Sequence, residues 1–166
     1  DAREIDQLCR QQLFPGRERP VLPARRLHGL LMGFADLVVE HRGCYWVLDY
    51  KSNDLGQRPE DYGAASRQAA ILEHRYEVQA VLYLLALHRL LRARLGAAYR
   101  PHQQLGGAMI WFIRGVSGPQ SGCESISTPW ALIEALDAAI EAGASAAVSA
   151  VAGTGAGRDA PGIAPE

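Results

Sequence analysis

Residues 33–52 constrain the fold more than any other stretch, because their sequence predicts two strands joined by a tight turn. Valine, tyrosine and tryptophan recur in this stretch, and these residues favour an extended backbone. We predict the strands at about 34–40 and 44–51, with Arg42 and Gly43 supplying the turn between them. The stretch is therefore expected to form a β-hairpin.

This hairpin would bring two carboxylates face to face. If the turn has two residues, Asp36 lies directly opposite Asp49, and the Cβ atoms of directly opposed residues are about 4.5–5.5 Å apart. Side chains alternate between the two faces of a strand, so Lys51 points to the same face as Asp49. The opposite face is expected to be the core face and carries Leu37, Val39, Trp46 and Leu48.

Two carboxylates this close repel each other, so they must share a proton, find cationic partners or hold a metal ion. A site of oxygen ligands with few protein groups suits Mg²⁺. The other interpretation is an ion cluster of Asp36, Lys51 and Asp49 on a solvated face of the sheet. The spacing alone does not decide between the two.

The distribution of positive charge favours a special role for Lys51. Of the 17 basic residues, 16 are arginine and one is lysine, and that lysine is Lys51. Lysine carries a compact charge and gives up a proton more readily than arginine does. Its place beside Asp49 suggests a task that a guanidinium cannot perform, although chance placement would give the same count.

Three motifs resemble those of the PD-(D/E)xK nucleases, and most closely those of RecB-type nuclease domains. They are Gly33-Phe34-Ala35-Asp36, then Leu48-Asp49-Tyr50-Lys51-Ser52, then Tyr76-Glu77-Val78-Gln79 with Tyr83. A lone Asp-x-Lys is a weak motif, but the ordered set at this spacing is specific, and the resemblance covers about residues 5–140. It implies an α/β fold with a restriction-endonuclease-like core, in which a small mixed central sheet is flanked by helices.

The resemblance also implies an activity and a set of site residues. The activity would be that of a Mg²⁺-dependent exodeoxyribonuclease, with Mn²⁺ able to substitute. Asp36, Asp49 and the backbone carbonyl of Tyr50 would bind the metal ion. Lys51 would orient or deprotonate the attacking water, or stabilise the transition state.

A polar pair on a helix predicted at 75–95 completes the expected site. Gln79 and Tyr83 are four residues apart, which makes them neighbours on the helix surface. In the family such residues border the active site, and the glutamine helps to hold DNA or water. The alternative is a polar pair at the junction of helix and sheet.

One ligand of the family has no match in this sequence. RecB-type nucleases carry a metal-binding histidine on a helix well upstream of the Asp36 motif, and none of the five histidines corresponds to it. The sequence begins with aspartate rather than methionine. We therefore expect an N-terminally truncated piece of a longer protein, with weak or no nuclease activity when isolated.

The resemblance places the chain in a bacterial, cytoplasmic helicase–nuclease for double-strand break repair and DNA degradation. Its partners would be single- and double-stranded DNA and RecC-like and RecD-like subunits. The alternative is a non-catalytic module that docks on a partner subunit or on DNA. Intact Asp36, Asp49 and Lys51 argue against that alternative. A net charge of −1 gives no global basic footprint, so any DNA contact must be local.

The remaining sequence bounds the class of protein. Three widely spaced cysteines exclude a zinc ribbon and favour a reducing cytosol. No apolar run approaches the roughly 20 residues of a membrane span.

We predict a nuclease domain over 1–144 and an Ala/Gly-rich tail with little structure over 145–166. Further elements are predicted as helices at 2–13 and 129–142, a buried strand at 106–114 and a loop at 115–127.

Overall fold

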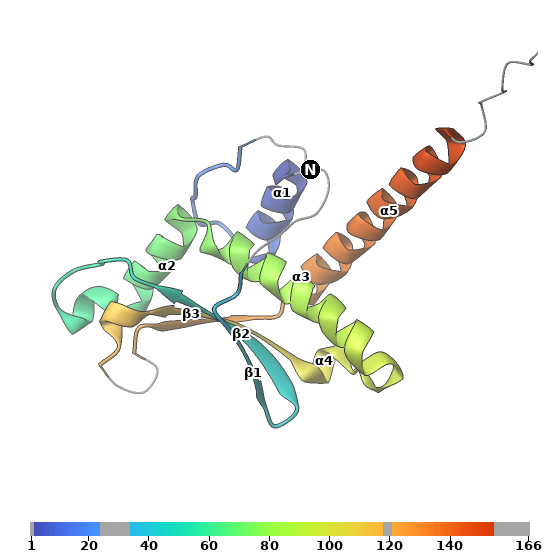
Figure 1. The fold of residues 1–166 in the computed structure, drawn as a ribbon. Coiled ribbons are helices and arrows are strands. Elements are labelled where there is room, and N and C mark those ends of the chain that lie inside the picture. Colours follow the sequence, from blue (N-terminus) through green and yellow to red (C-terminus); the bar gives the residue numbers. More distant parts are fainter. Residues whose placement is uncertain (1, 24–33, 118–120, 155–166) are drawn as a thin grey trace, which may run out of the picture.

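The computed structural model describes residues 2–23, 34–117 and 121–154, with side chains up to residue 142 in the last helix. It has a mixed α/β fold (Figure 1). The strands are β1 (Leu37–His41), β2 (Cys44–Lys51), β3 (Leu105–Phe112) and β4 (Cys123–Ser127). The helices are α1 (Ala2–Gln12), α2 (Ala64–Glu73), α3 (Tyr76–Leu95), α4 (Pro101–Gln104) and α5 (Trp130–Thr154). The predicted fold class is confirmed.

The four strands form one mixed sheet in the order β1-β2-β3-β4. β1 and β2 form the predicted antiparallel hairpin, in which His41 pairs with Cys44. The turn residues Arg42 and Gly43 have φ angles of 52° and 78°, and a type I′ hairpin turn needs positive φ at both central positions. The two-residue turn and the predicted register are thus confirmed.

β1 begins at Leu37, three residues later than predicted. Asp36 therefore lies just before the paired strand. Its carboxylate, rather than its backbone, reaches β2, because Asp36 Oδ2 accepts a hydrogen bond of 2.7 Å from the backbone N–H of Tyr50.

The core lies between the sheet and α3. β2 and β3 run parallel, and the chain between them forms the helical crossover that parallel neighbours need. In Figure 1, α3 lies across the sheet, and it contacts both central strands. At this contact, the side chains that are at most 1% exposed are Val81 and Leu84 of α3 and Val47, Ile110 and Phe112 of the strands.

The predicted core face of the hairpin is right only in part, because the main core lies on the opposite face of β2. Val47 on that opposite face is 1% exposed and belongs to the core cluster, and Asp49 on the same face is 8% exposed. In β1 neither Leu37, at 40% exposed, nor Val38 on the other face, at 46%, is buried. Both faces of the hairpin carry apolar residues, so alternation along the strands could not decide between them. The crossover helix α3 packs on the face of Asp49. Among the other residues of the predicted face, Leu48 is buried, and Val39 and Trp46 are half-buried.

The C-terminal part contains more regular structure than predicted. The predicted loop at 115–127 includes β4, which pairs antiparallel with β3 and has one aliphatic residue, Ile126. The strand predicted at 106–114 ends at Phe112, where a 3₁₀ turn begins. The C-terminal end of β3 could not be located from hydrophobicity, because the apolar run continues into the turn at Ile113.

α5 continues to Thr154, so the prediction of little structure from residue 145 is wrong as far as this helix extends. Alanine is the strongest helix former, and this outweighs the missing apolar period. Residues 155–166 lie outside the described part, and the division into a domain and a tail stays a prediction. No helix among the described residues is long and apolar enough to cross a membrane.

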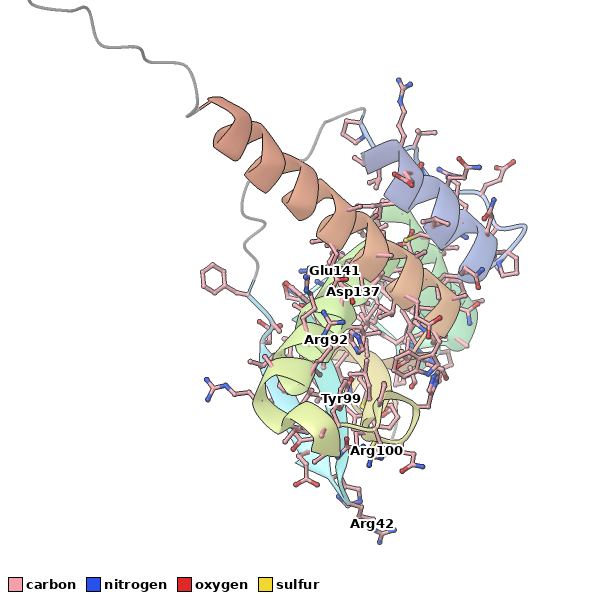
Figure 2. The ribbon with its side chains drawn as sticks, turned by 90° about the vertical axis from the view of Figure 1, so that its right-hand side faces the viewer. Arg42, Arg92, Tyr99, Arg100, Asp137 and Glu141 are labelled. Atoms are coloured by element: carbon pink, nitrogen blue, oxygen red, sulfur yellow. The ribbon has the colours of Figure 1, made fainter. Side chains whose placement is uncertain are left out.

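Ion pairs fasten α5 to α3. Arg92 of α3 donates hydrogen bonds of 2.7 Å to Asp137 and 2.9 Å to Glu141 on α5, and Figure 2 shows the three side chains together. Leu132 and Leu136 of α5 are buried in the core cluster. The N-terminal half of α5 is therefore held on the domain by apolar and charged contacts.

A buried ion cluster ties α1 and the loop after it to the start of α3. Arg75 donates hydrogen bonds of 2.6 Å to Asp6, 2.7 Å to Glu77 and 2.6 Å to the backbone carbonyl of Pro20. Arg75 has a φ of 58°, which is uncommon for a residue other than glycine. The position of α3 thus depends on contacts made by a residue in an unusual conformation.

Candidate active site

Asp49 lies on the central strand β2, facing α3, and pairs with Lys51 two residues later on the same face. Burial raises the pKa of the Asp49 carboxyl above its usual value. The Lys51 ammonium opposes this rise, and the nearby negative charge of Asp36 adds to it. Asp36 therefore lies close enough to Asp49 in the folded protein to disfavour the charged form of the Asp49 carboxyl.

Asp36 approaches Asp49 from the segment that leads into β1. It is exposed, and its hydrogen bond to the Tyr50 N–H fixes it against β2. Along an antiparallel strand, the N–H and the C=O of one residue point toward the same neighbouring strand. The carbonyl of Tyr50 therefore faces the side from which Asp36 reaches the Tyr50 N–H.

The oxygen atoms at the C-terminal end of β2 fit a divalent metal ion. The carboxylates of Asp36 and Asp49 and the carbonyl of Tyr50 are hard oxygen donors, which Mg²⁺ prefers. Across residues 2–23, 34–117 and 121–154, no three His, Cys, Asp or Glu side chains gather as a possible metal site. An ion here would take two carboxylates and complete its shell with the backbone carbonyl and water.

Lys51 is enclosed by three groups. Its ammonium pairs with Asp49 and donates a 2.8 Å hydrogen bond to Gln79 Oε1 on α3. Its Nζ also lies 3.9 Å from the centre of the Tyr76 ring. The lysine side chain is only 11% exposed, so these contacts hold the charge in one place beside the carboxylates.

A short relay of hydrogen bonds connects Lys51 to the segment before Asp36. Gln79 Nε2 donates to the Tyr83 hydroxyl at 2.7 Å, and that hydroxyl donates to the backbone carbonyl of Phe34 at 2.5 Å. The structure thus brings together all the residues that the sequence predicts for the site. Their catalytic roles stay predictions.

Two neighbours of Lys51 were assigned no role from the sequence. Tyr76 lies over the ammonium, and the Tyr76 hydroxyl donates a 3.1 Å hydrogen bond to Asn53 Oδ1. Spacing offered one signal, because Tyr76 precedes Gln79 by three residues and residues so spaced share a helix face. The contact with Asn53 joins segments too far apart in sequence for spacing to predict.

The model of the PD-(D/E)XK nuclease superfamily matches residues 4–153 of this chain. The chain belongs to the PD-(D/E)XK nuclease superfamily. Nucleases of this superfamily generally use divalent metal ions, in agreement with the oxygen donors at the edge of β2. The restriction-endonuclease-like fold predicted from the motifs is thereby confirmed.

The chain is similar to the subunit RecB of the RecBCD enzyme from several bacteria. It is 41% identical to the protein of Escherichia coli K12 over 138 residues, which cover 82% of this chain and 12% of that protein. It is 39% identical to the protein of Mycobacterium tuberculosis over 119 residues, covering 66% and 11%. The Haemophilus influenzae protein is 38% identical over 102 residues, covering 61% and 8%. The chain thus spans about a tenth of the length of these relatives.

For this superfamily member, we expect Asp49→Asn to raise the melting temperature of the metal-free protein near pH 7. Asparagine keeps the shape of the neutral acid and removes a buried charge. The Asp49 pKa is higher in the folded than in the unfolded chain, so the carboxylate lowers stability above its folded pKa and has no such effect below its unfolded pKa.

The gain from Asp49→Asn should therefore shrink as the pH falls toward about 3, below the usual aspartate pKa. Thermal melts followed by circular dichroism in EDTA at several pH values measure this change in melting temperature, with Asp54→Asn as the control. A lower melting temperature for Asp49→Asn at every pH would mean that the ion pair with Lys51 outweighs the burial of the charge.

Proposed function

We propose that the chain is a nuclease domain that hydrolyses phosphodiester bonds of DNA with a divalent metal ion, Mg²⁺ in the cell. One observation carries the proposal: Asp36, Asp49 and Lys51 meet at the end of β2, where Gln79 accepts a hydrogen bond from Lys51. Two carboxylates beside a fixed ammonium suit phosphoryl chemistry, in which positioning and charge do most of the catalysis.

Asp36, Asp49 and the carbonyl of Tyr50 would hold the metal. When bound, the metal supplies positive charge to the phosphate and lowers the pKa of water. The hydrogen bond from the Tyr50 N–H holds the Asp36 carboxylate in place before any ligand arrives. A ligand set fixed in this way loses little freedom on binding the ion.

Lys51 is placed to serve the reacting phosphate or water. Its ammonium lies between Asp49 and Gln79, so it can donate to an oxygen that enters beside the carboxylates. In that position it can orient the attacking water or stabilise negative charge that builds up on the phosphate. The contacts with Gln79 keep the ammonium from following the substrate out of the site.

The relatives are named as RecB subunits of the RecBCD enzyme. We extend the proposal accordingly to an exonuclease role in a helicase–nuclease that degrades DNA and repairs double-strand breaks, with RecC-like and RecD-like subunits as partners. No observation favours a non-catalytic docking module. Asp36, Asp49 and Lys51 are all present: Lys51 pairs with Asp49, and Asp36 is bonded to the backbone of Tyr50 between them.

The proposal is tested by degradation of linear single- and double-stranded DNA with Mg²⁺. We expect at most weak cleavage by the isolated chain, since the upstream histidine ligand has no match in it. EDTA and Asp36→Asn should each abolish that cleavage, and Asp54→Asn, a change at an exposed aspartate, should leave it unchanged. Isothermal calorimetry on the same three proteins should show weakened Mg²⁺ or Mn²⁺ binding for Asp36→Asn alone.

A domain exchange makes the test independent of the activity of the isolated chain. This chain would replace the matched 138-residue region of E. coli RecB in the assembled RecBCD enzyme. DNA degradation by the hybrid, lost in its Asp36→Asn form, supports the proposal. A hybrid that assembles and unwinds DNA but degrades none of it would favour the docking module instead.

A further inference from the structure

The Tyr76 ring is the third group in contact with the ammonium of Lys51, the only lysine of the sequence. Asp49 and Gln79 occupy two sides of the Lys51 ammonium, and the centre of the Tyr76 ring lies 3.9 Å from Nζ. We propose that Tyr76 is a positioning residue, whose aromatic face holds the Lys51 ammonium at the carboxylate pair. The catalytic consequence of this inference rests on the proposed nuclease function; the placement itself does not.

The ring is itself fixed from two directions. Its hydroxyl donates a 3.1 Å hydrogen bond to Asn53 Oδ1, two residues after Lys51 in the chain. The His74 ring stacks on it, with 5.2 Å between ring centres and 21° between the ring planes. Tyr76 thus connects the start of α3 to the segment after β2, and the ring cannot easily turn away from Lys51.

An aromatic face suits the third side of this ammonium for a physical reason. A cation is attracted to the negative face of a ring, most strongly when both are shielded from water, and the Lys51 side chain is 11% exposed. A ring neutralises no charge, whereas a third carboxylate would. Tyr76 therefore restrains the flexible lysine without adding a second counter-charge to the one that Asp49 supplies.

Substitutions at Tyr76 separate the ring from the hydroxyl. Tyr76→Phe keeps the ring and should hold turnover within about threefold, since the ring makes the cation contact. Tyr76→Leu removes the ring but stays apolar, and should lower turnover on the order of tenfold or more, because a catalytic group displaced by about 1 Å loses up to 10²-fold. The Michaelis constant for linear DNA should change far less than turnover in both variants.

The control is the same change at Tyr62, a tyrosine that is more deeply buried than Tyr76. Tyr62 is 5% exposed and accepts a hydrogen bond from the Leu55 N–H, away from Lys51. Tyr62→Leu should lower the melting temperature without a selective loss of turnover in protein that remains folded. Equal turnover for Tyr76→Leu and wild type, with wild type active, would overturn the catalytic part of the inference.

The position of the Lys51 side chain can be measured without an assay of nuclease activity, because Lys51 is the only lysine of the sequence. Selective ¹³C-lysine labelling gives one set of side-chain signals by nuclear magnetic resonance. Protons above an aromatic face are shifted upfield, so the ε-methylene protons of Lys51 should be upfield in wild type and in Tyr76→Phe.

In Tyr76→Leu these protons should return to the position of free lysine, whereas in Tyr62→Leu they should stay upfield. A free-lysine position in the wild type would overturn the inference. An upfield signal, beside a RecBCD hybrid that assembles and degrades no DNA, would leave the placement standing and count against the proposed nuclease function instead.

Discussion

Lys51→Ala is expected to lower the rate of DNA cleavage on the order of 10²- to 10³-fold, the usual effect of removing one fixed donor from a charged reacting centre. DNA affinity should stay nearly unchanged, because Lys51 is mostly enclosed and paired with Asp49 rather than presented to the backbone of DNA. Single-turnover cleavage with Mg²⁺ by the RecBCD hybrid that carries this chain measures the first quantity, and fluorescence anisotropy with labelled DNA measures the second.

Lys51→Arg should fail nearly as badly, although it keeps the charge. The space for the ammonium is bounded by Gln79 Oε1 at 2.8 Å and by the Tyr76 ring at 3.9 Å. A planar guanidinium is larger and does not give up a proton. Arg42→Ala, at the exposed tip of the hairpin (Figure 2), is the matched control and should leave cleavage unchanged. Full activity of Lys51→Arg would mean that charge alone suffices.

The hairpin could be predicted from the sequence because local chemistry determines it. Strand-forming residues flank a turn that needs positive φ, and Gly43 supplies one of those positions freely. The register then follows, and with it the meeting of Asp36 and Asp49. The buried face could not be predicted in the same way, since it depends on α3, which packs there from more than twenty residues later in the chain.

Contacts between distant segments limited the prediction of the site. Lys51 and Gln79 are 28 residues apart in sequence, and only the resemblance to a family placed them together. Tyr76 belongs to the same family motif as Gln79, but neither its contact with the Lys51 ammonium nor its bond to Asn53 followed from that motif. β4 was missed for a related reason: its polar sequence becomes a strand only because β3 offers it an edge to pair with.

Arg75→Met is expected to destabilise the protein by about 3–5 kcal/mol, the usual cost of removing one partner from a buried ion pair. Arg75 is the residue that satisfies Asp6 and Glu77 together, at 2.6 Å and 2.7 Å. Glu77 is fully buried, and without Arg75 its nearest remaining cation is Arg19 at 3.4 Å. Chemical unfolding in urea, followed by circular dichroism, measures the change.

Arg58→Met provides the same substitution at an exposed pair. Arg58 is 74% exposed and bound to Asp61, and exposed pairs contribute little to stability because water and salt screen them. We expect its unfolding free energy to stay close to that of the wild type. A similarly small change for Arg75→Met would show that water or a rearranged Arg19 compensates Glu77.

The position of the cluster gives the Arg75 result a meaning for the site. Arg75 immediately precedes α3, the helix that presents Tyr76 and Gln79 to Lys51. Its bonds to Asp6 and to the Pro20 carbonyl anchor the start of that helix to α1 and the loop after it. In Arg75→Met that remains folded, the Lys51 ε-methylene signal should therefore move toward the position of free lysine. An unchanged signal beside a large loss of stability would mean that the cluster supports the fold without positioning the lysine.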